Sequence, residues 1–482
     1  MIRIATTKKV RQLVVGDMFR FARCISILAI LFCMGLHAED FPVPKGLEAG
    51  VAFWKRVYSE WSTNQIAFSD EQDLGMVYTV IDVPDDRDSV SRKLRAEKIR
   101  KMKNELRIAL NELETLRPQS EAEVTGLAQT VFMALKDNPR EDKYRRADFI
   151  RAQNGLKERF EQGYFMAGAH ESEIRTRLIQ AGLPEDLIAI AFVESLFHPK
   201  AKSHAGACGI WQFLKGTARE YLSVNKLVDE RFDPILATEA AIEYIKSARE
   251  TLVEWPLVIT SYNYGRAGMA RAVDAVKSRD FDEILKNYSG DRFGFAARNY
   301  YAEFLAAVSI YRDAKAYFPD EEQASPWSYD VLTLANPAFL RDLTRHDHEL
   351  SQDLAQLNPA LTKEVVTGKE VLPTGFRLRV PKGERKQLIA KMNACPKAEK
   401  RRAEQAVRAR HRSNGRQTLA QIAGMYDVAD DRLAERMGID PKKKLRRGTV
   451  VNIRSAESKF TPLPDPIYKP KVDAETPLSQ DG

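Results

Sequence analysis

The apolar run Leu187-Ile-Ala-Ile-Ala-Phe-Val193, which ends at Glu194, constrains the fold more than any other part of the chain. Pro184, Glu185 and Asp186 precede it and suit the first turn of a helix, because proline fits there and acidic residues face the positive end of the helix dipole. Such a helix must be mostly buried, with its carboxylate at the rim of a cleft. Apolar surroundings disfavour a charged carboxylate, so the pKa of Glu194 should rise, as a general acid requires. A solvated helix end is the competing interpretation.

Three further segments follow Glu194 at informative spacings. They are Ser203-His-Ala-Gly-Ala-Cys-Gly-Ile-Trp-Gln-Phe213, Thr260-Ser-Tyr-Asn-Tyr-Gly265 and Ala297-Arg-Asn-Tyr-Tyr-Ala-Glu-Phe-Leu305. In the first, Gly206 and Gly209 bracket a turn where backbone can approach a ligand closely. Trp211 and Phe213 form either an aromatic wall for a sugar or plain core. The amide of Gln212 needs polar partners if it is buried.

Two side chains of the second segment complete the candidate sugar site. Asn263 offers both a donor and an acceptor to an acetamido group, with a helix N-cap as the alternative role. Tyr262 precedes it and is a candidate positioning residue. The segment follows an expected helix from Leu236 to Leu252 and a turn at Trp255-Pro256.

With Glu194-Ser195, this order of motifs resembles the family 1 lytic transglycosylases of the membrane-bound lytic murein transglycosylase D type. The resemblance covers roughly residues 150 to 310. It implies a mainly α, goose-type lysozyme-like (SLT) catalytic domain that cleaves the MurNAc–GlcNAc bond of peptidoglycan. It also implies that Glu194 is the only acid/base and that the C6 hydroxyl of MurNAc attacks its own anomeric carbon, giving a 1,6-anhydro product.

The resemblance assigns roles to further residues. Tyr300, in Arg-Asn-Tyr, would hold the catalytic carboxylate, although the adjacent Tyr301 is a weaker candidate for the same role. Ser195 would orient the sugar or Glu194 by hydrogen bonding, with helix capping as the alternative. Gln212, Tyr262 and Asn263 would bind or position the substrate.

The chain departs from the family pattern in two places. Many relatives carry Pro-x-Glu-Thr before Arg-Asn-Tyr, whereas this chain has Gly294-Phe-Ala-Ala297, which puts the neighbouring subsite in doubt. Cys208 replaces a small residue and is interpreted as packing, not as a nucleophile.

No second carboxylate is evident, and Asp229, Glu230 and Asp233 resemble a loop before a helix. A hydrolytic muramidase on the same fold and a non-catalytic cell-wall-binding protein therefore stay open.

The remaining chain divides into six segments beside the catalytic domain at 166–320. The N-terminal region is expected to be mainly helical, since Ile99, Met102, Leu106, Ala109, Leu113 and Leu116 form an apolar stripe and residues 124–135 supply a second helix. Residues 411–454 resemble a LysM module, a small α+β unit that binds N-acetylglucosamine-containing glycans, and 330–382 resembles a degenerate copy. The segments are 1–38 (signal peptide), 39–165 (N-terminal helical arm), 330–382, 383–410 (basic helical linker), 411–454 and 455–482 (disordered tail).

The leader and the charge balance bear on location and partners. Basic residues precede the apolar stretch Ile25–Leu36 and a small-residue cleavage site at Ala38, which predicts export to the periplasm or cell envelope, with lipidation at Cys33 as a lesser alternative. Residues 1–38 hold six Lys or Arg and one Asp, so their removal lowers the net charge of +8 by five. Nucleic acid is not implied. A monomer with free thiols, no metal and no cofactor is expected, acting on peptidoglycan glycan strands.

Overall fold

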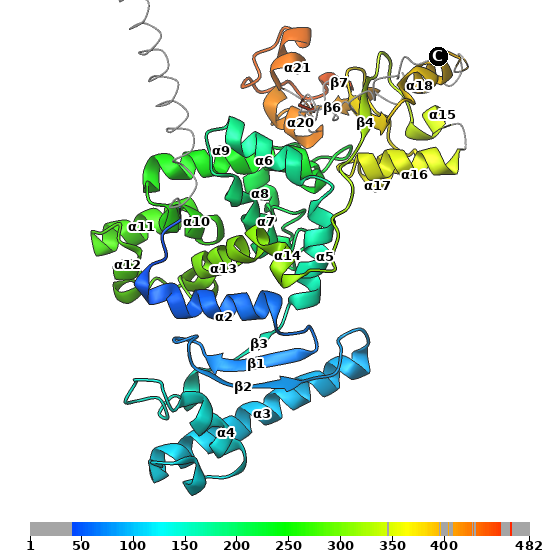
Figure 1. Ribbon diagram of the computed structural model, residues 1–482. Helices are drawn as coiled ribbons and strands as arrows, with labels where there is room; N and C mark the ends of the chain where they lie inside the picture. The colour runs from blue at the N-terminus through cyan, green and yellow to red at the C-terminus, as the bar shows by residue number, and fades with distance from the viewer. Residues whose placement is uncertain are drawn as a thin grey trace, which may run out of the picture.

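A computed structural model of the chain describes residues 41–344, 347–394, 396, 403, 408–426, 428, 430–454 and 463–464. The expected leader at 1–38 and nearly all of the expected tail at 455–482 lie outside these residues. Helices dominate the described part, so the mainly α class predicted from the sequence is confirmed. Figure 1 shows a sheet with two helices on one side of a central helical domain, and small modules on the other side.

The helical domain is organised around α13 (Phe295–Arg312), whose side chains are buried on most of its surface. α2 (Glu48–Ser59), α7 (Ala189–Ser195) and α10 (Trp255–Tyr264) pack directly against it. The other helices and 3-10 turns of the domain are α5 (Lys157–Ala167), α6 (Glu171–Gln180), η4 (Glu185–Ile188), α8 (Lys215–Ala218), η5 (Glu230–Phe232), α9 (Pro234–Leu252), α11 (Arg266–Val276), α12 (Phe281–Asn287) and α14 (Ala314–Tyr317).

The N-terminal boundary of this domain lies outside the expected position at residue 166. Phe53, Trp54 and Tyr58 on α2 are buried in the same hydrophobic core as Phe160 on α5 and Phe192 on α7. Tyr58 packs on Phe160 with ring centroids 5.2 Å apart, and Phe160 stacks on Phe192 at 4.8 Å. A large aromatic cluster of this kind stabilises the domain only if α2 stays docked. The first helix of the expected arm is therefore part of the core of the helical domain.

A three-stranded antiparallel sheet in the order β2-β1-β3 connects this core to the rest of the N-terminal region. Its strands are β1 (Gln65–Asp70), β2 (Val77–Asp82) and β3 (Ile150–Asn154). Successive side chains of β1 point to opposite faces. Ala67 therefore joins the core of the helical domain, whereas Ile66 and Phe68 join a second core. The sequence analysis expected a mainly helical region here, and the three strands are an addition to that prediction.

The second core belongs to the predicted helix pair. α3 (Ser89–Leu116) begins at Asp88, whose carboxylate accepts hydrogen bonds from the backbone N–H groups of Val90 and Ser91. It packs against α4 (Gly126–Leu135) through Leu106, Ala109 and Leu113 of the apolar stripe. Leu116, the last member of the stripe, is exposed because the helix ends there. The helix hairpin predicted from the stripe is confirmed.

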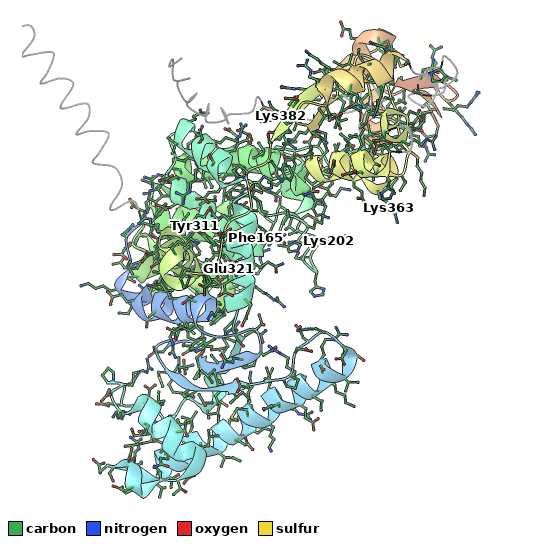
Figure 2. The ribbon with its side chains drawn as sticks, turned by 45° about the vertical axis from the view of Figure 1, so that its right-hand side comes forward. Phe165, Lys202, Tyr311, Glu321, Lys363 and Lys382 are labelled. Carbon is green, nitrogen blue, oxygen red and sulfur yellow. The ribbon has the colours of Figure 1, made fainter. Side chains whose placement is uncertain are left out.

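The first C-terminal module packs on the helical domain through a buried ion pair and backbone hydrogen bonds. It contains β4 (Tyr329–Thr333), α15 (Leu340–Thr344), α16 (His348–Leu357), α17 (Lys363–Val366) and β5 (Arg377–Pro381). Arg379 on β5 forms a fully buried ion pair with Asp233, the N-cap residue of α9. Backbone N–H groups of Asp229 and Thr362 donate to the carbonyls of Ala360 and Leu227 across the same junction, at 2.7 and 3.0 Å. Figure 2 shows this module, marked by Lys363 and Lys382, beside the domain that carries Phe165 and Tyr311.

The expected basic linker at 383–410 begins as part of that module. α18 (Arg385–Asn393) is helical, as predicted, but it packs against β4 and α15 with Leu388 fully buried. The second module then has β6 (Arg408–Arg412), α20 (Leu419–Tyr426), α21 (Asp430–Met437) and β7 (Val450–Arg454), with β6 and β7 antiparallel. The module is thus a small α+β unit, as expected for 411–454, with the order strand–helix–helix–strand around a small core of its own.

Part of the expected tail packs on the helical domain. Leu463 lies in the segment expected to be disordered, yet its side chain is buried in the core of the helical domain, so the prediction is wrong at this residue.

No helix within the described ranges has the length and apolar character needed to cross a membrane.

Candidate active site

Glu194 occupies the end of a helix that the surrounding sequence shapes sharply. The side chains of Leu187, Ile190 and Ala191 are fully buried, as the apolar run predicts. Directly after Ser195 the chain turns, because Leu196 and Phe197 both adopt the left-handed conformation at φ 49° and 56°. Two consecutive non-glycine residues in that region store strain, which is commonly found at functional sites. The turn ends α7 so that the Glu194 carboxylate faces α13.

Tyr300 holds the carboxylate of Glu194. Its hydroxyl donates a hydrogen bond to Glu194 Oε1 at 2.5 Å. Burial raises the pKa of Glu194 to about 7, and the hydrogen bond from Tyr300 opposes this rise. Tyr301 faces elsewhere and donates to the carbonyl of Pro42. Glu194 can therefore exist as a proton donor or as a base near neutral pH, which are the two states that an acid/base catalyst must alternate between.

Ser195 joins α7 to the next motif. Its hydroxyl lies 3.1 Å from the carbonyl of Ala191 and 3.0 Å from that of Ile210, and donates to these backbone oxygens. Neither bond caps the helix N-terminus or reaches Glu194. Ser195 thus fixes the segment from Ile210 to Phe213 beside the catalytic helix, and its influence on Glu194 passes through the backbone.

The segment around Gln212 is mostly structural. Trp211 is fully buried and its indole N–H donates to Thr238 Oγ1 at 2.9 Å, so it is core and not a sugar-facing wall. Phe213 is also buried. Gln212 has a left-handed backbone at φ 48°, and its amide Nε2 donates to the carbonyl of Gly209 at 2.7 Å. The amide nitrogen thus holds the loop in shape.

Tyr262 and Asn263 lie near the C-terminal end of α10. The hydroxyl of Tyr262 donates to the carbonyl of Trp211 at 3.0 Å. Burial raises the pKa of Tyr262 well above its usual value, and the nearby charge of Glu194 adds to the rise. Asn263 is exposed within the helix, so the alternative role as an N-cap is wrong. The structure brings Tyr262 near the Glu194 carboxylate and leaves Asn263 exposed on the surface.

Packing against another loop of the protein requires glycine at position 209. A Cβ at this position would lie 1.8 Å from the carbonyl oxygen of Arg231, and φ is +76°. The close backbone approach predicted for this turn is present, but the partner is another loop and not a ligand. Gly206 has a similar φ of +82° with open space around it.

Gly209→Ala should therefore lower the free energy of unfolding by about 3 kcal/mol or more, since the loop carrying Arg231 must move. Gly206→Ala is the matched control and should cost only the backbone strain, about 1–2 kcal/mol. Urea unfolding of both variants measures the difference. Equal losses in the two variants would contradict the packing argument.

The acidic cluster at 229–233 has structural roles. Asp229 pairs with Arg231, whose guanidinium also donates to the carbonyls of Gly206 and Phe213. Asp233 caps α9 and binds Arg379. The loop thus links the Gln212 segment to the docked module. Cys208 in that segment is a free, buried thiol, and burial raises its pKa, which agrees with packing and not with nucleophilic chemistry.

Glu303 supplies a second carboxyl group near Glu194 that was not predicted from the sequence. Glu303 is half-buried on α13, one helical turn after Tyr300, and its carboxyl group lies near the hydroxyl of Tyr58 on α2. Burial raises the pKa of Glu303 to about 8, and the charge of Glu194 adds to the rise. The i,i+3 spacing from Tyr300 was the available signal, because such residues share one helix face.

A cleft of about 1060 Å³ lies away from Glu194. The start of α2, the β1–β2 turn and the start of α13 line it, including Gly294 and Phe295 of the segment that departs from the family pattern. Its lining mixes cations and anions and contains none of the candidate site residues. We place the chemistry at Glu194, where the titratable groups converge. Among the described residues, no group of three or more His, Cys, Asp or Glu could hold a metal ion.

Comparison with known proteins agrees with this geometry. Residues 174–285 match the family described as the transglycosylase SLT domain. The membrane-bound lytic murein transglycosylase D of Escherichia coli is 29% identical over 141 residues, which is 28% of this chain and 30% of that protein. A putative tributyltin chloride resistance protein of Alteromonas is 28% identical over 108 residues, 22% of this chain and 52% of that protein. The chain thus spans under a third of the first relative and about half of the second.

Two solved structures show local similarity. The lytic transglycosylase Slt of Pseudomonas aeruginosa aligns at 16% identity and a TM-score of 0.27, covering 45% of this chain and 31% of that one. The 70 kDa soluble lytic transglycosylase of Escherichia coli aligns at the same identity and TM-score, covering 49% and 46%. The matched segment begins on α6 and ends on α12, with Glu194, Gln212, Tyr262 and Asn263 inside it. Residues 174–285 of this chain are therefore similar to the transglycosylase SLT domain family.

Proposed function

We propose that this protein is a peptidoglycan lytic transglycosylase that cleaves the β-1,4 bond between MurNAc and GlcNAc. The observation that carries the proposal is the half-buried Glu194 carboxyl, with a pKa of about 7, held by the Tyr300 hydroxyl within a segment that matches the SLT domain family. A carboxyl group tuned in this way can donate a proton and then accept one near neutral pH.

The reaction needs one acid/base. Protonated Glu194 gives its proton to the glycosidic oxygen as the C1–O bond breaks, and the GlcNAc side leaves as an alcohol. The acetamido group of MurNAc assists this step. The carboxylate of Glu194 then takes the proton of the C6 hydroxyl while that oxygen bonds to C1. No water is consumed, and the attack gains from its intramolecular geometry.

The other candidate residues position the site. Tyr300 orients Glu194, and Ser195 and Tyr262 fix the backbone from Ile210 to Phe213 against it. Gln212 and the exposed Asn263 would contact the sugar, with the Gln212 carbonyl oxygen as acceptor and the Asn263 amide facing the acetamido group.

The modules, partners and location belong to the same proposal. Residues 330–382 and 411–454 would act as LysM-like modules on N-acetylglucosamine-containing glycan. Binding there would raise the effective concentration of the enzyme on an insoluble substrate. The protein would work as a monomer in the periplasm or cell envelope after removal of residues 1–38, without a metal or cofactor.

Glu303 gives one observation in favour of a second candidate, a hydrolytic muramidase. Hydrolysis classically uses two carboxyl groups, and Glu303 shares a buried cluster with Glu194. In that reaction water would replace the C6 hydroxyl, and the product would carry a reducing MurNAc end.

Mass spectrometry of the soluble products from residues 39–482 and purified peptidoglycan separates these functions. Products that end in 1,6-anhydroMurNAc, lighter by one water and resistant to borohydride, are expected. Reducing ends would assign the protein to the muramidases. Binding without any release would leave a cell-wall-binding protein whose SLT domain is inactive.

A further inference from the structure

We propose that the cleft between the start of α2, the β1–β2 turn and the start of α13 binds the short acidic peptide that branches from the lactyl group of MurNAc. The ligand class is a peptide with free carboxylates and one ammonium group. The inference rests on the proposed function, because it names the part of the same substrate that a second site would hold. The cleft volume of about 1060 Å³ is comparable to the upper end of the range for ligand pockets.

The charges that line the cleft are sorted by the element that carries them. Lys45 lies in the 3-10 turn before α2, Lys286 in the last turn of α12 and Arg298 in the first turns of α13. The carboxylates Glu71 and Asp73 belong to the β1–β2 turn. Figure 1 shows the sheet below α2, with α12 and α13 above it. The cations thus come from the helical domain and the acids from the turn of the sheet.

Two lining residues break this order, and both have partners within the protein. Asp282 on α12 accepts hydrogen bonds from the first two backbone N–H groups of the 3-10 turn, at 3.1 and 2.9 Å. Arg140 pairs with Asp142 at 2.9 Å and lies 3.9 Å from Asp73. Asp282 therefore fixes the start of α2 beside α12, and Arg140 fixes the β1–β2 turn.

The three cations of the helical side form no ion pair with a carboxylate of the described residues. Lys45 and Lys286 are exposed. Arg298 is half-buried, donates to the carbonyl of Leu285 and lies over the ring of Phe293 at 5.6 Å. Burial lowers the pKa of Arg298, since the guanidinium loses hydration there. A buried charge is costly without a counter-ion, so a carboxylate in the cleft would supply the missing partner.

Two further features at the start of α13 suit a peptide ligand. Gly294 is the N-cap residue and provides no side-chain cap, and the first turn contains no acidic residue, so its N–H groups favour an anion. Asn299 is 9% exposed, and its Nδ2 donates to the carbonyl of Phe295, whereas no described residue donates to its Oδ1. That oxygen faces Gly50, which also lines the cleft. It can accept an amide N–H of a peptide.

The lining is poorly suited to the glycan strand itself. Among the described residues that line the cleft, Phe295 is the only aromatic one, and the guanidinium of Arg151 covers its ring at 3.4 Å from the centroid. Little aromatic surface is left for a sugar ring to stack on, and a neutral sugar offers no counter-ion. A stem peptide carries carboxylates for the helical side and an ammonium group for Glu71.

α13 connects the cleft to the active site. Phe295, Arg298 and Asn299 share one face of its first two turns, at spacings of three and four. Tyr300, which holds Glu194, follows directly, about 1.5 Å further along the helix axis. An extended peptide spans up to about 3.5 Å per residue. A peptide that leaves MurNAc near Glu194 would therefore follow α13 into the cleft.

The site draws on parts of the chain outside the family match. Lys45, Glu71, Lys286 and Arg298 lie outside residues 174–285. The segment 294–297, which departs from the family pattern, supplies two of the lining residues. The N-terminal region and this segment would thus add a peptide site to the domain that carries Glu194.

Charge reversal at the exposed cations tests the proposal by binding alone. The probe is the free stem tetrapeptide, released from sacculi by an amidase, and its binding to residues 39–482 is measured by isothermal titration calorimetry. Lys45→Glu/Lys286→Glu should weaken binding by about tenfold or more, because attraction becomes repulsion. Added salt should weaken binding to the wild type.

Lys93→Glu/Lys98→Glu is the matched control, since it makes the same change of charge at exposed positions of α3 outside the lining. Its affinity should stay within about twofold of the wild type, because distant exposed charges are screened. Absence of peptide binding by the wild type would overturn the proposal. Equal affinities of the wild type and the cleft variant would do the same.

Gly294→Trp closes the cleft without a change of charge. The backbone at Gly294 has φ −87°, which any residue adopts, and a Cβ there would meet no atom within 4 Å. The indole should therefore occupy the space of the cleft while the fold is kept, and a Tm measurement checks that it is. We expect at least about fivefold weaker peptide binding, because the side chain and the ligand compete for the same volume. Full affinity in the folded variant would contradict the assignment of this cleft.

Uncross-linked glycan strands with and without their peptides separate this proposal from the proposed function. For the wild type, kcat/KM should be roughly fivefold higher on the peptide-bearing strands, and this ratio should fall towards one in both cleft variants. A wild-type ratio of one would overturn the proposal. So would an equal loss on both substrates, because the cleft would then hold the glycan. If the wild type releases no anhydro product from either substrate, the proposed function fails, while calorimetry still reports on the peptide site.

Discussion

Glu194→Gln is expected to reduce release of 1,6-anhydro products by about a thousandfold or more, because the proposed reaction uses this carboxyl group twice. The amide keeps the size of the side chain and can accept the Tyr300 hydrogen bond, but it can neither donate a proton to the glycosidic oxygen nor take one from the C6 hydroxyl. Rates of product release from sacculi, with the anhydro product counted by mass spectrometry, measure the loss.

Two comparisons make the result specific. Glu161→Gln carries the same chemical change outside the site and should keep the wild-type rate. Binding to sacculi should survive in Glu194→Gln, which separates catalysis from glycan recognition. If Glu194→Gln still cut glycan at the wild-type rate, the assignment of the acid/base would be wrong.

The same variant has a predicted effect on stability. The folded pKa of Glu194, about 7, lies above its ordinary value. Stability linked to such a group is complete below the unfolded pKa and is lost as the pH rises through the folded pKa. Glutamine cannot ionise, so the variant should have a higher Tm than the wild type above about pH 7, and a similar Tm below about pH 4. A site that sacrifices stability for function behaves in this way.

The local parts of the site were predictable because their signals are local. The apolar run before Glu194 predicts a buried helix from seven consecutive residues, and α7 follows. The Arg-Asn-Tyr motif selected Tyr300 over Tyr301, and the hydrogen bond to Glu194 is made by Tyr300. The stripe on α3 predicted its helix hairpin for the same reason, since the 3-4 spacing is complete within one segment.

The parts that were missed depend on contacts between distant segments. Tyr58 reaches Glu303 only because α2 packs along α13, and no pattern within either helix specifies that partner. β1 and β3 are short strands whose pairing joins residues far apart in sequence. The tail shows the same limit: its five prolines predicted a disordered segment, yet Leu463 is buried against the helical domain.

The docking of the first module is the most consequential of these distant contacts. Asp233 and Arg379 are 146 positions apart, and their side chains are 2% and 1% exposed. Arg379 Nη2 donates to Asp233 Oδ1 at 3.0 Å, and Asp233 also accepts from the first backbone N–H groups of α9. Burial by itself would raise the pKa of Asp233, but the Arg379 guanidinium and these N–H groups hold it below its usual value. The carboxylate is therefore charged in the folded protein.

Arg379→Met should lower the free energy of unfolding by about 3–5 kcal/mol, because it leaves a buried carboxylate without its cation. Adding Asp233→Asn should restore most of the loss, since asparagine still caps α9 and carries no charge. Lys382→Met is the control within the same module: Lys382 pairs with Asp330 at 2.9 Å but is 60% exposed, so its loss should cost under about 1 kcal/mol. Urea unfolding at neutral pH compares the four proteins.

The pH dependence of that difference identifies its cause. A carboxylate with a lowered folded pKa contributes stability above its unfolded pKa, near 3.9, and loses it as the pH falls through the folded value. Without Arg379, burial raises the pKa of Asp233, so the gap between wild type and Arg379→Met should be full at neutral pH and shrink as the pH falls and Asp233 takes up a proton. A gap that persists unchanged in acid would mean that Arg379 acts by packing beneath Trp327 and Tyr329. The loop that carries Asp233 also contacts Gly209 and Phe213 through Arg231. In that case the ion pair would be linked to the segment from Gly209 to Phe213 only through the packing of this loop. Loss of the ion pair should then leave the rate of the folded enzyme unchanged.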